Sequence, residues 1–294
     1  MCTQPLTCYE NPDGGRPIFG WEGHKRGLPE LKLPCGKCPE CQKDYYTQWA
    51  TRGSRELARW PISLFVTLTY DDAHLPADRS LNKKDVQDFI KRVKKHASST
   101  KENPVRQIYC GEYGTRTLRP HYHVILFNFD LPDRKAWRKS DQGKTVYTSE
   151  TLKRLWPFGN SEFGIAEPGG IAYLFKYVLK KKTRKEKEKP LELLIGDTTY
   201  EVAHEFIEAS RNPGIGAHMR ESRSIKKGYL SVNGVRTKLP KYYQNFLQIH
   251  DPATYERLKD ARFEVAINKP KETSLRKKQK QEAQRILTDT KKKL

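Results

Sequence analysis

His121 and His123 lie in an apolar segment that is typical of a β-strand. Alternate side chains of a strand project from the same face, so both imidazoles could bind one cation. Alone, a His-x-His pair is more often incidental, but Glu112 falls in the preceding predicted strand, and cross-strand neighbours stand about 5 Å apart. Two imidazoles and one carboxylate leave positions open for water and a phosphate oxygen, which suits Mg²⁺ or Mn²⁺ better than a closed structural zinc site.

A second group of reactive side chains falls on a predicted helix over residues 170–181. Plotted at about 100° per residue, Tyr173, Lys176, Tyr177 and Lys180 share one arc of about 100°, and apolar residues fill the opposite side. Tyrosines at a helix border and lysines on a solvated face would explain one such pair. Two tyrosines in register, each followed three residues later by lysine, favour a reactive surface.

The chemistry of this helix follows from the phenol. A phenol with a pKa of about 10 is a poor nucleophile at neutral pH until a cation stabilises its phenolate. A lysine one turn away would do so, and a metal across the cleft would polarise a phosphate. Attack on a phosphodiester would leave a 5′-phosphotyrosine and a free 3′-hydroxyl, and a second nucleophile could later reverse the step. We therefore predict that the two tyrosines and two lysines are catalytic.

Cys35, Cys38 and Cys41 form a C-x₂-C-x₂-C run, which offers three thiolates where structural zinc takes four ligands. The fourth could be Cys2, Cys8 or His24. An iron–sulfur cluster is the weaker interpretation, because position 45 is tyrosine where a ferredoxin run has cysteine. Reduced thiols without metal stay open as the alternative to zinc. Cys110, within a predicted strand, is expected in the core.

These groups need elements that position them. Segments 62–70, 105–111 and 121–127 predict strands, and the last has apolar residues on both faces, as in a covered central strand. Asn82 suits the N-cap of a helix whose apolar stripe is Val86, Phe89, Ile90 and Val93. Residues 114–120 predict a hairpin connection, and a long polar loop is expected after residue 127. The mixture predicts an α+β core with an antiparallel sheet.

Composition divides the chain into four regions. Residues 1–60 combine a Gly- and Pro-rich opening, the cysteine cluster and a helix from about Glu40 to Trp60, and residues 61–182 form the core. A charged stretch over 181–190 indicates a linker, and 183–268 predict a small α-rich accessory region, with Asp251 and Pro252 starting one helix. Residues 269–294 predict a basic tail that is frayed or disordered.

The 294 residues include 56 Lys and Arg against 35 Asp and Glu, which gives a formal net charge of +21. Nucleic acid is the simplest partner for such a field, since each neutralised phosphate releases counterions, although a ribosomal-type or merely soluble basic protein would share it. No apolar run approaches the roughly 18 residues that span a bilayer, and the N-terminus lacks a secretion pattern. We expect a cytosolic protein without a membrane partner, whose six cysteines bind metal or stay reduced.

In this order, the groups resemble the HUH endonucleases, and within them the replication-initiation proteins of gokushovirus-like microviruses, which are small single-stranded DNA phages. The resemblance covers most of the chain. Residues 65–70 are similar to the first motif of the family, 119–127 to its metal motif, with Tyr122 where a bulky residue is usual, and 173–177 to its two-tyrosine motif. Two segments narrow the resemblance to the phages: residues 34–41, followed by Trp49, Arg52 and Glu56, and residues 210–216.

The resemblance implies a sheet of about five strands with the histidines on a central one. It also implies an enzyme that nicks the duplex replicative form at its origin, stays attached to the 5′ end, and later circularises the displaced strand. Its partners would be single-stranded and supercoiled origin DNA, host polymerase and, since no G-x₄-G-K-S/T loop is present, a host helicase, all in the host bacterial cytoplasm. No small-molecule substrate is expected. Arg116 and Arg119 are the predicted DNA contacts, and Asp71 or Asp72 could replace Glu112, because family members vary at the third ligand.

Two rival functions stay open. A plasmid relaxase or an HUH transposase would perform the same chemistry on another DNA, although most such transposases use a single tyrosine. A non-catalytic, zinc-stabilised nucleic-acid-binding protein would use the cysteines and the basic surface. That protein would bind DNA without a covalent adduct, and Tyr177→Phe would have little effect on it.

Overall fold

The computed structural model describes residues 2–178, 190–232, 234–268 and a few positions between 273 and 283. The side chains of residues 172, 176–178, 232, 266 and 267 are outside that description. The predicted linker over 181–190 and the predicted tail over 269–294 lie almost wholly outside the described residues. The chain divides into two compact units, one of Met1–Thr47 with Asp251–Leu294 and one of Gln48–His250. No helix of the described residues is long and apolar enough to cross a membrane.

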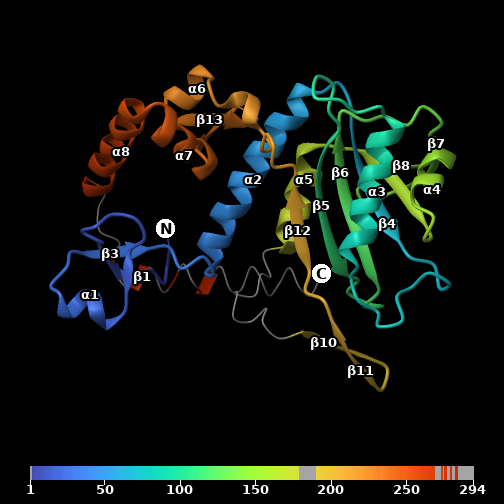
Figure 1. Cartoon of the computed structure of the whole chain (residues 1–294), viewed down its shortest axis with the longest axis horizontal. Coiled ribbons are helices and arrows are strands. Elements are labelled where there is room, and N and C mark those ends of the chain that lie inside the picture. The colour runs from blue at the N-terminus through green and yellow to red at the C-terminus, as the bar shows by residue number, and fades with distance from the viewer. Residues whose placement is uncertain are drawn as a thin grey trace. The chain divides into compact units, whose positions relative to one another are not determined.

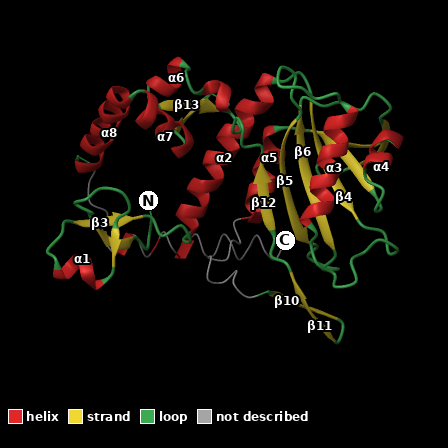
Figure 2. Cartoon of the chain, viewed as in Figure 1, coloured by secondary structure: helices red, strands yellow, loops and turns green. Residues whose placement is uncertain are grey.

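The smaller unit contains a three-stranded antiparallel sheet in the order β2-β1-β3. Its elements are β1 (Leu6–Tyr9), β2 (Ile18–Phe19), α1 (Trp21–Lys25), β3 (Glu30–Leu33), the start of α2 (Pro39–Arg59) and α8 (Pro252–Ile267) (Figures 1 and 2). Helix α2 confirms the predicted helix of this region. At α8, the Asp251 carboxylate accepts a hydrogen bond from the Thr254 amide at 3.2 Å, which confirms the predicted cap.

The larger unit is built on one antiparallel sheet of seven strands in the order β12-β5-β6-β4-β9-β8-β7. The strands are β4 (Ser63–Thr69), β5 (Arg106–Tyr113), β6 (Pro120–Phe127), β7 (Lys135–Lys139), β8 (Thr145–Thr148), β9 (Ser161–Ile165) and β12 (Phe206–Ala209). This confirms the α+β class and the central position of the His121–His123 strand. The sheet exceeds about five strands because β12 and the β7–β8 hairpin extend its two edges. The segment expected as a polar loop contains that hairpin, since every residue of β7 is exposed and none gives an apolar signal.

Helices α3 (Lys83–His96) and α4 (Glu150–Leu155) cover one face of this sheet (Figure 1). Alternate residues of β4 pack there, and the apolar stripe of α3 is buried against them as predicted: Leu64, Val66, Leu68, Val86, Phe89, Ile90 and Val93. The Asn82 side chain caps α3 by accepting from the Lys84 amide at 3.0 Å. Tyr122 points to this face too, and its hydroxyl accepts from the Asn82 amide at 2.8 Å and donates to the Asn82 carbonyl at 2.9 Å. Strand β6 is thereby fixed to the start of α3.

Helix α5 (Pro168–Val178) packs on the opposite face, and two glycines permit its close approach. A Cβ atom at Gly170 would lie 3.0 Å from the Phe65 ring of β4. On α2, a Cβ atom at Gly53 would lie 2.7 Å from Cγ2 of Ile171, the wholly buried side chain in the first turns of α5. The stacked rings of Trp49 and Phe175, with centroids 5.0 Å apart, complete the contact. The position of α5 over the sheet therefore depends on small residues at two points.

The region expected to be α-rich, 183–268, also contributes strands. It contains β10 (Leu191–Ile195), β11 (Thr198–Val202), β12, η2 (Ala217–Met219), α6 (Arg223–Lys226), β13 (Tyr229–Val232), β14 (Val235–Lys238), α7 (Lys241–His250) and α8. The pairs β10–β11 and β13–β14 are two-stranded hairpins, and only β12 joins the large sheet. Strands of four or five residues on hairpins with little buried surface carry a weak alternation signal, which explains why helices alone were expected.

The two segments that narrowed the resemblance to phage proteins meet in this unit. The Arg52 guanidinium on α2 donates to the Ile215 carbonyl at 3.0 Å, and the Glu56 carboxylate accepts from the Gly216 amide at 2.7 Å. Glu56 also lies 2.9 Å from Nε of Arg106 on β5, and both side chains are buried. Helix α2, the loop over 210–216 and the central sheet are thus joined by one buried polar cluster.

Candidate active site

Glu112, His121 and His123 come together on the sheet face that α5 covers. The β5–β6 pairing sets Glu112 directly opposite His121, and His123 lies two residues further along the same face. Oε1 of Glu112 is 3.1 Å from Nε2 of His121 and 2.9 Å from Nε2 of His123. One ligand atom from each of the three residues falls within 4.8 Å of the others, so one metal ion could contact all three.

The second nitrogen of each imidazole has its own oxygen partner. Nδ1 of His121 is 3.3 Å from the Arg119 carbonyl, and Nδ1 of His123 is 3.1 Å from the Thr67 hydroxyl. When Nδ1 carries the proton and donates it to that oxygen, the Nε2 lone pair is left for a cation. Thr67 pairs with His123 across β4 and β6, and only that register reveals it, so sequence reasoning missed it.

The electrostatics of the group favour a positive charge at its centre. Burial raises the pKa of the Glu112 carboxyl, but hydrogen bonds and charge from His121 and His123 outweigh it and lower the pKa to about 2. Burial lowers the pKa of His121, whereas its contact with Glu112 raises it, and the net change is upward. A buried carboxylate beside two imidazoles fits a divalent cation, because N, N and O donors leave room for water or phosphate oxygen.

Tyr173 is the member of the predicted catalytic group whose side chain the structure describes. Its ring centroid lies 5.8 Å from that of His123, edge to face, and 6.2 Å from that of Phe65. The side chain is 39% exposed, so a large substrate could reach it. The side chains of Lys176 and Tyr177 and the whole of Lys180 lie outside the described residues.

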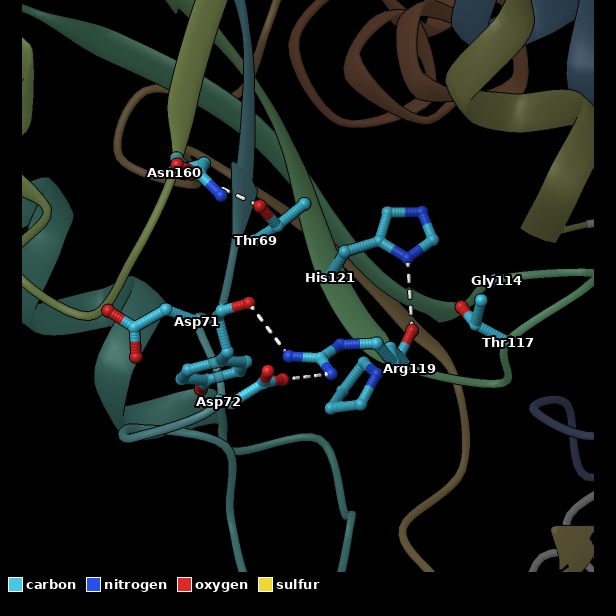
Figure 3. Close-up of a pocket in the computed structure, with 10 residues that line it drawn as sticks. Thr69, Asp71, Asp72, Gly114, Thr117, Arg119, His121 and Asn160 are labelled. Carbon is cyan, nitrogen blue, oxygen red and sulfur yellow. Dashed lines mark hydrogen bonds and ion pairs between the residues drawn. The ribbon is translucent and has the colours of Figure 1, made fainter. Parts of the chain in front are cut away.

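An open pocket of about 480 Å³ adjoins His121 (Figure 3). Asp71, Asp72 and Arg119 line it, with Asn160 and Thr117 at its rim. The Arg119 guanidinium donates to Asp72 at 2.6 Å and to the Tyr70 carbonyl at 3.1 Å. Asp71 accepts from the His74 amide at 2.9 Å, so Glu112, and neither of these aspartates, joins the two histidines. Arg116 is exposed in the neighbouring turn.

A second group of potential ligands lies in the smaller unit and consists of Cys2, Cys35, Cys38 and Cys41. The other candidate fourth ligands are engaged elsewhere. The Cys8 thiol donates to the Leu31 carbonyl at 3.6 Å, and the His24 ring stacks on Trp21 with centroids 4.8 Å apart. Cys110 is buried in the large sheet, as expected.

Three known proteins and one family resemble the chain. The family model of the replication-associated protein ORF2 matches residues 63–182, which contain both the metal ligands and Tyr173. The chain is 32% identical over 259 residues to the "Replication-associated protein VP4" of Bdellovibrio phage phiMH2K, covering 85% of this chain and 78% of that protein. It is 29% identical over 250 residues to the "Replication-associated protein ORF2" of Spiroplasma virus 4, covering 82% and 74%, respectively. For the "Replication-associated protein ORF4" of Chlamydia phage 1 the identity is 26% over 232 residues, covering 74% and 53%. No solved structure matches.

Proposed function

The chain belongs to the replication-associated proteins of gokushovirus-like microviruses, and on that basis we propose that it starts phage replication by nicking origin DNA through a tyrosine. One observation carries the proposal. The Tyr173 ring packs 5.8 Å from the His123 ring, beside a His–His–Glu group that suits a divalent metal. A nucleophile next to such a group is the arrangement that phosphodiester transfer requires.

In the proposed reaction, the Tyr173 hydroxyl oxygen bonds to phosphorus as the bond between phosphorus and the 3′ oxygen breaks. The phenolic proton passes to solvent, and the departing 3′ oxygen takes up a proton as a free 3′-hydroxyl. Mg²⁺ or Mn²⁺ on Glu112, His121 and His123 would polarise the phosphate and offset its developing charge. The tyrosyl ester keeps the energy of the phosphodiester, so attack by a 3′-hydroxyl can rejoin the strand.

The remaining predicted residues have roles in the same proposal. Tyr177, one turn after Tyr173, takes over the strand in the second cleavage, and Lys176 and Lys180 stabilise phenolate and phosphate charge. Arg116 contacts phosphates, and Arg119 does so while holding the pocket wall against Asp72. The enzyme acts on supercoiled and single-stranded origin DNA in the host cytoplasm, with host helicase and polymerase supplying unwinding and synthesis.

A denaturing gel tests the proposal. Labelled single-stranded origin DNA is incubated with the full chain and Mn²⁺, and a protein-linked DNA band is expected. Tyr173→Phe should weaken or re-route the band, and Tyr173→Phe with Tyr177→Phe should remove it. Tyr147→Phe, which removes a hydroxyl from β8 outside the pocket, is the matched control and should leave the band unchanged.

The metal assignment needs a separate comparison. His121→Ala with His123→Ala should abolish cleavage and leave salt-sensitive DNA binding intact, because that binding depends on surface charge. Cleavage that survives the double substitution would refute the metal site. Binding without a covalent band under every divalent metal would refute the nicking reaction and favour a non-catalytic DNA-binding protein.

A further inference from the structure

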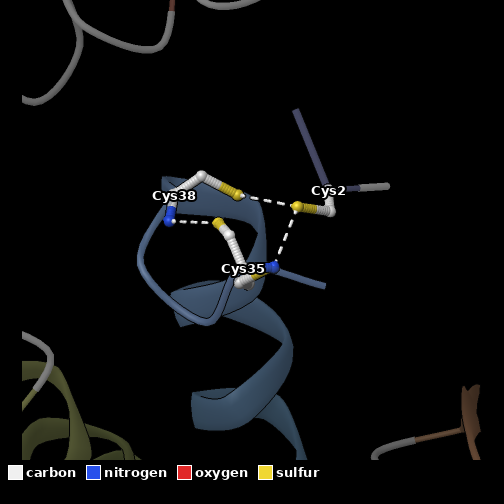
Figure 4. A group of neighbouring side chains, drawn as sticks. Cys2, Cys35 and Cys38 are labelled. Carbon is white, nitrogen blue, oxygen red and sulfur yellow. Dashed lines mark hydrogen bonds between the residues drawn. The ribbon is translucent and has the colours of Figure 1, made fainter. Parts of the chain in front are cut away.

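Four cysteine sulfurs converge in the smaller unit. The Sγ atoms of Cys2, Cys35, Cys38 and Cys41 lie within 4.8 Å of one another, and Figure 4 shows Cys2 beside the turn that holds Cys35 and Cys38. All four thiols are free, and Sγ of Cys2 is 3.8 Å from Sγ of Cys38. A disulfide would need about 2.05 Å, whereas a tetrahedron with metal–sulfur bonds of about 2.3 Å has edges of about 3.8 Å. The spacing is that of ligands around one ion.

Backbone amides point at two of these sulfurs. The amides of Lys37 and Cys38 donate to Sγ of Cys35 at 3.4 and 3.3 Å, and the Cys35 amide donates to Sγ of Cys2 at 3.3 Å. The turn depends on Gly36, whose φ of 75° is in the left-handed region that glycine tolerates best. Such hydrogen bonds offset the negative charge that a sulfur carries as a metal ligand.

The other two cysteines lie at the start of α2. Cys38 directly precedes the helix, and its carbonyl accepts from the Gln42 amide at 3.0 Å, while Cys41 is in the first turn. The positive end of the helix dipole therefore faces the sulfur group. Cys2 is additionally held there because the Thr3 hydroxyl donates to Glu40 at 3.3 Å.

This part of the molecule has almost no hydrophobic core. Among the described residues of Met1–Thr47, the buried apolar side chains are those of Cys8 and Cys38, while Leu6, Phe19 and Trp21 are exposed. Three strands of two to four residues cannot be stabilised by so little apolar burial. Small units of this kind are usually stabilised by disulfides or a metal, and all six cysteines of this chain are free.

We propose that Cys2, Cys35, Cys38 and Cys41 bind one structural Zn²⁺ that fixes the three-stranded sheet to the first turn of α2. Four sulfurs close the coordination sphere, so this ion contacts no substrate and takes no part in the nicking chemistry. A multi-iron cluster is larger than a single ion and would hold its cysteines further apart than these sulfurs lie. The zinc site is independent of the proposed function, because its ligands are separate from Glu112, His121 and His123.

Metal analysis of the full chain tests the site. The protein is purified from zinc-supplemented medium without chelator, and zinc and iron are measured by mass spectrometry. We expect one zinc per chain, a tetrahedral thiolate spectrum after replacement by Co²⁺, and release of the zinc when a thiol reagent has blocked four cysteines. Cys2→Ser and Cys41→Ser should each reduce the zinc to well under half, whereas Cys110→Ala, a buried cysteine of the other unit, should retain it.

Several results would overturn the site. They are a zinc-free wild-type chain, stoichiometric iron, or full zinc content in Cys2→Ser. If the serine variants fail to fold, thiol-triggered release from the wild-type chain still decides the question. His121→Ala with His123→Ala should keep its zinc, and loss there would assign the ion to the other site. A chain that holds zinc but gives no covalent DNA band would refute the nicking reaction alone.

Discussion

The buried ion pair between Glu56 and Arg106 provides the sharpest test of how the larger unit is held together. The Glu56 side chain is 1% exposed, and its Oε2 atom accepts from the Gly216 amide at 2.7 Å. Its Oε1 atom accepts from the Trp60 indole at 3.0 Å and lies 2.9 Å from Nε of Arg106 in a close ion pair without hydrogen-bond alignment. The Arg106 guanidinium also donates to the Pro213 carbonyl at 2.6 Å. One carboxylate therefore meets donors from α2, β5 and the loop over 210–216.

Glu56→Gln preserves the shape of the side chain but removes its charge. The amide nitrogen must face one of three donors, and the Arg106 guanidinium stays buried without a counter-ion. Removing one partner of a buried pair typically costs about 3–5 kcal/mol, which is a large share of a typical domain stability of about 5–15 kcal/mol. We expect the free energy of unfolding to fall by about that amount, because a donor without an acceptor adds to the lost Coulomb attraction.

Urea titration followed by tryptophan fluorescence measures the loss, with Arg106→Met and the double variant completing a cycle. The double variant should lose less than the sum of the single variants, since each single change leaves one uncompensated charge. Glu150→Gln, which removes a carboxylate from the exposed pair with Lys153, is the control and should cause no measurable change. A loss below about 1 kcal/mol for Glu56→Gln would refute a desolvated pair.

Two further predictions concern the elements around the site. Gly53→Ala introduces a Cβ atom 2.7 Å from Cγ2 of Ile171, so an overpacking cost of about 1–3 kcal/mol should exceed the gain of about 1 kcal/mol in helix propensity; nicking should fall, and Ile171→Val in the same chain should restore it, whereas an unchanged thermal midpoint and unchanged nicking would refute the close contact. Thr67→Val removes the hydroxyl beside Nδ1 of His123 and should weaken Mn²⁺ activation about 10- to 100-fold without unfolding the protein, measured by Mn²⁺ titration of the nicking reaction; equal loss in Thr69→Val, whose hydroxyl contacts the Asn160 carbonyl instead, would argue against a specific role in orienting His123.

The sequence predicted the elements whose side chains repeat with a strong period. The β-branched segment over 62–70, the Asn82 cap and the apolar stripe of α3 each have a local signal, and each forms as expected. Glu112 was a sound choice of third ligand because a hairpin register, once assumed, leaves it opposite His121. Local pattern and short-range pairing therefore carried most of the core of the larger unit.

Features that depend on distant contacts could not be predicted in the same way. Glu56 and Gly216 are 160 positions apart, and nothing in either segment indicates that a carboxylate will meet that amide. Strand β7 has only exposed residues, so its pairing with β8 comes from backbone hydrogen bonds and gives no apolar alternation. Cys2 could not be separated from Cys8 or His24 as a ligand, because spacing along the chain does not fix which side chain returns to the Cys35 turn.

The geometry of the candidate site is fixed from both faces of the sheet. On one face, Tyr122 anchors β6 to the cap of α3; on the other, the Arg119 carbonyl and the Thr67 hydroxyl orient the two imidazoles between which Tyr122 lies. Preorganised ligands lose little freedom when a cation binds, so both sets of contacts contribute to its affinity. The nucleophile is positioned differently, since Tyr173 belongs to a helix whose distance from β4 is limited by Gly170. Changes at α5 should therefore alter attack by tyrosine while leaving metal binding intact, and changes at Thr67 should do the reverse.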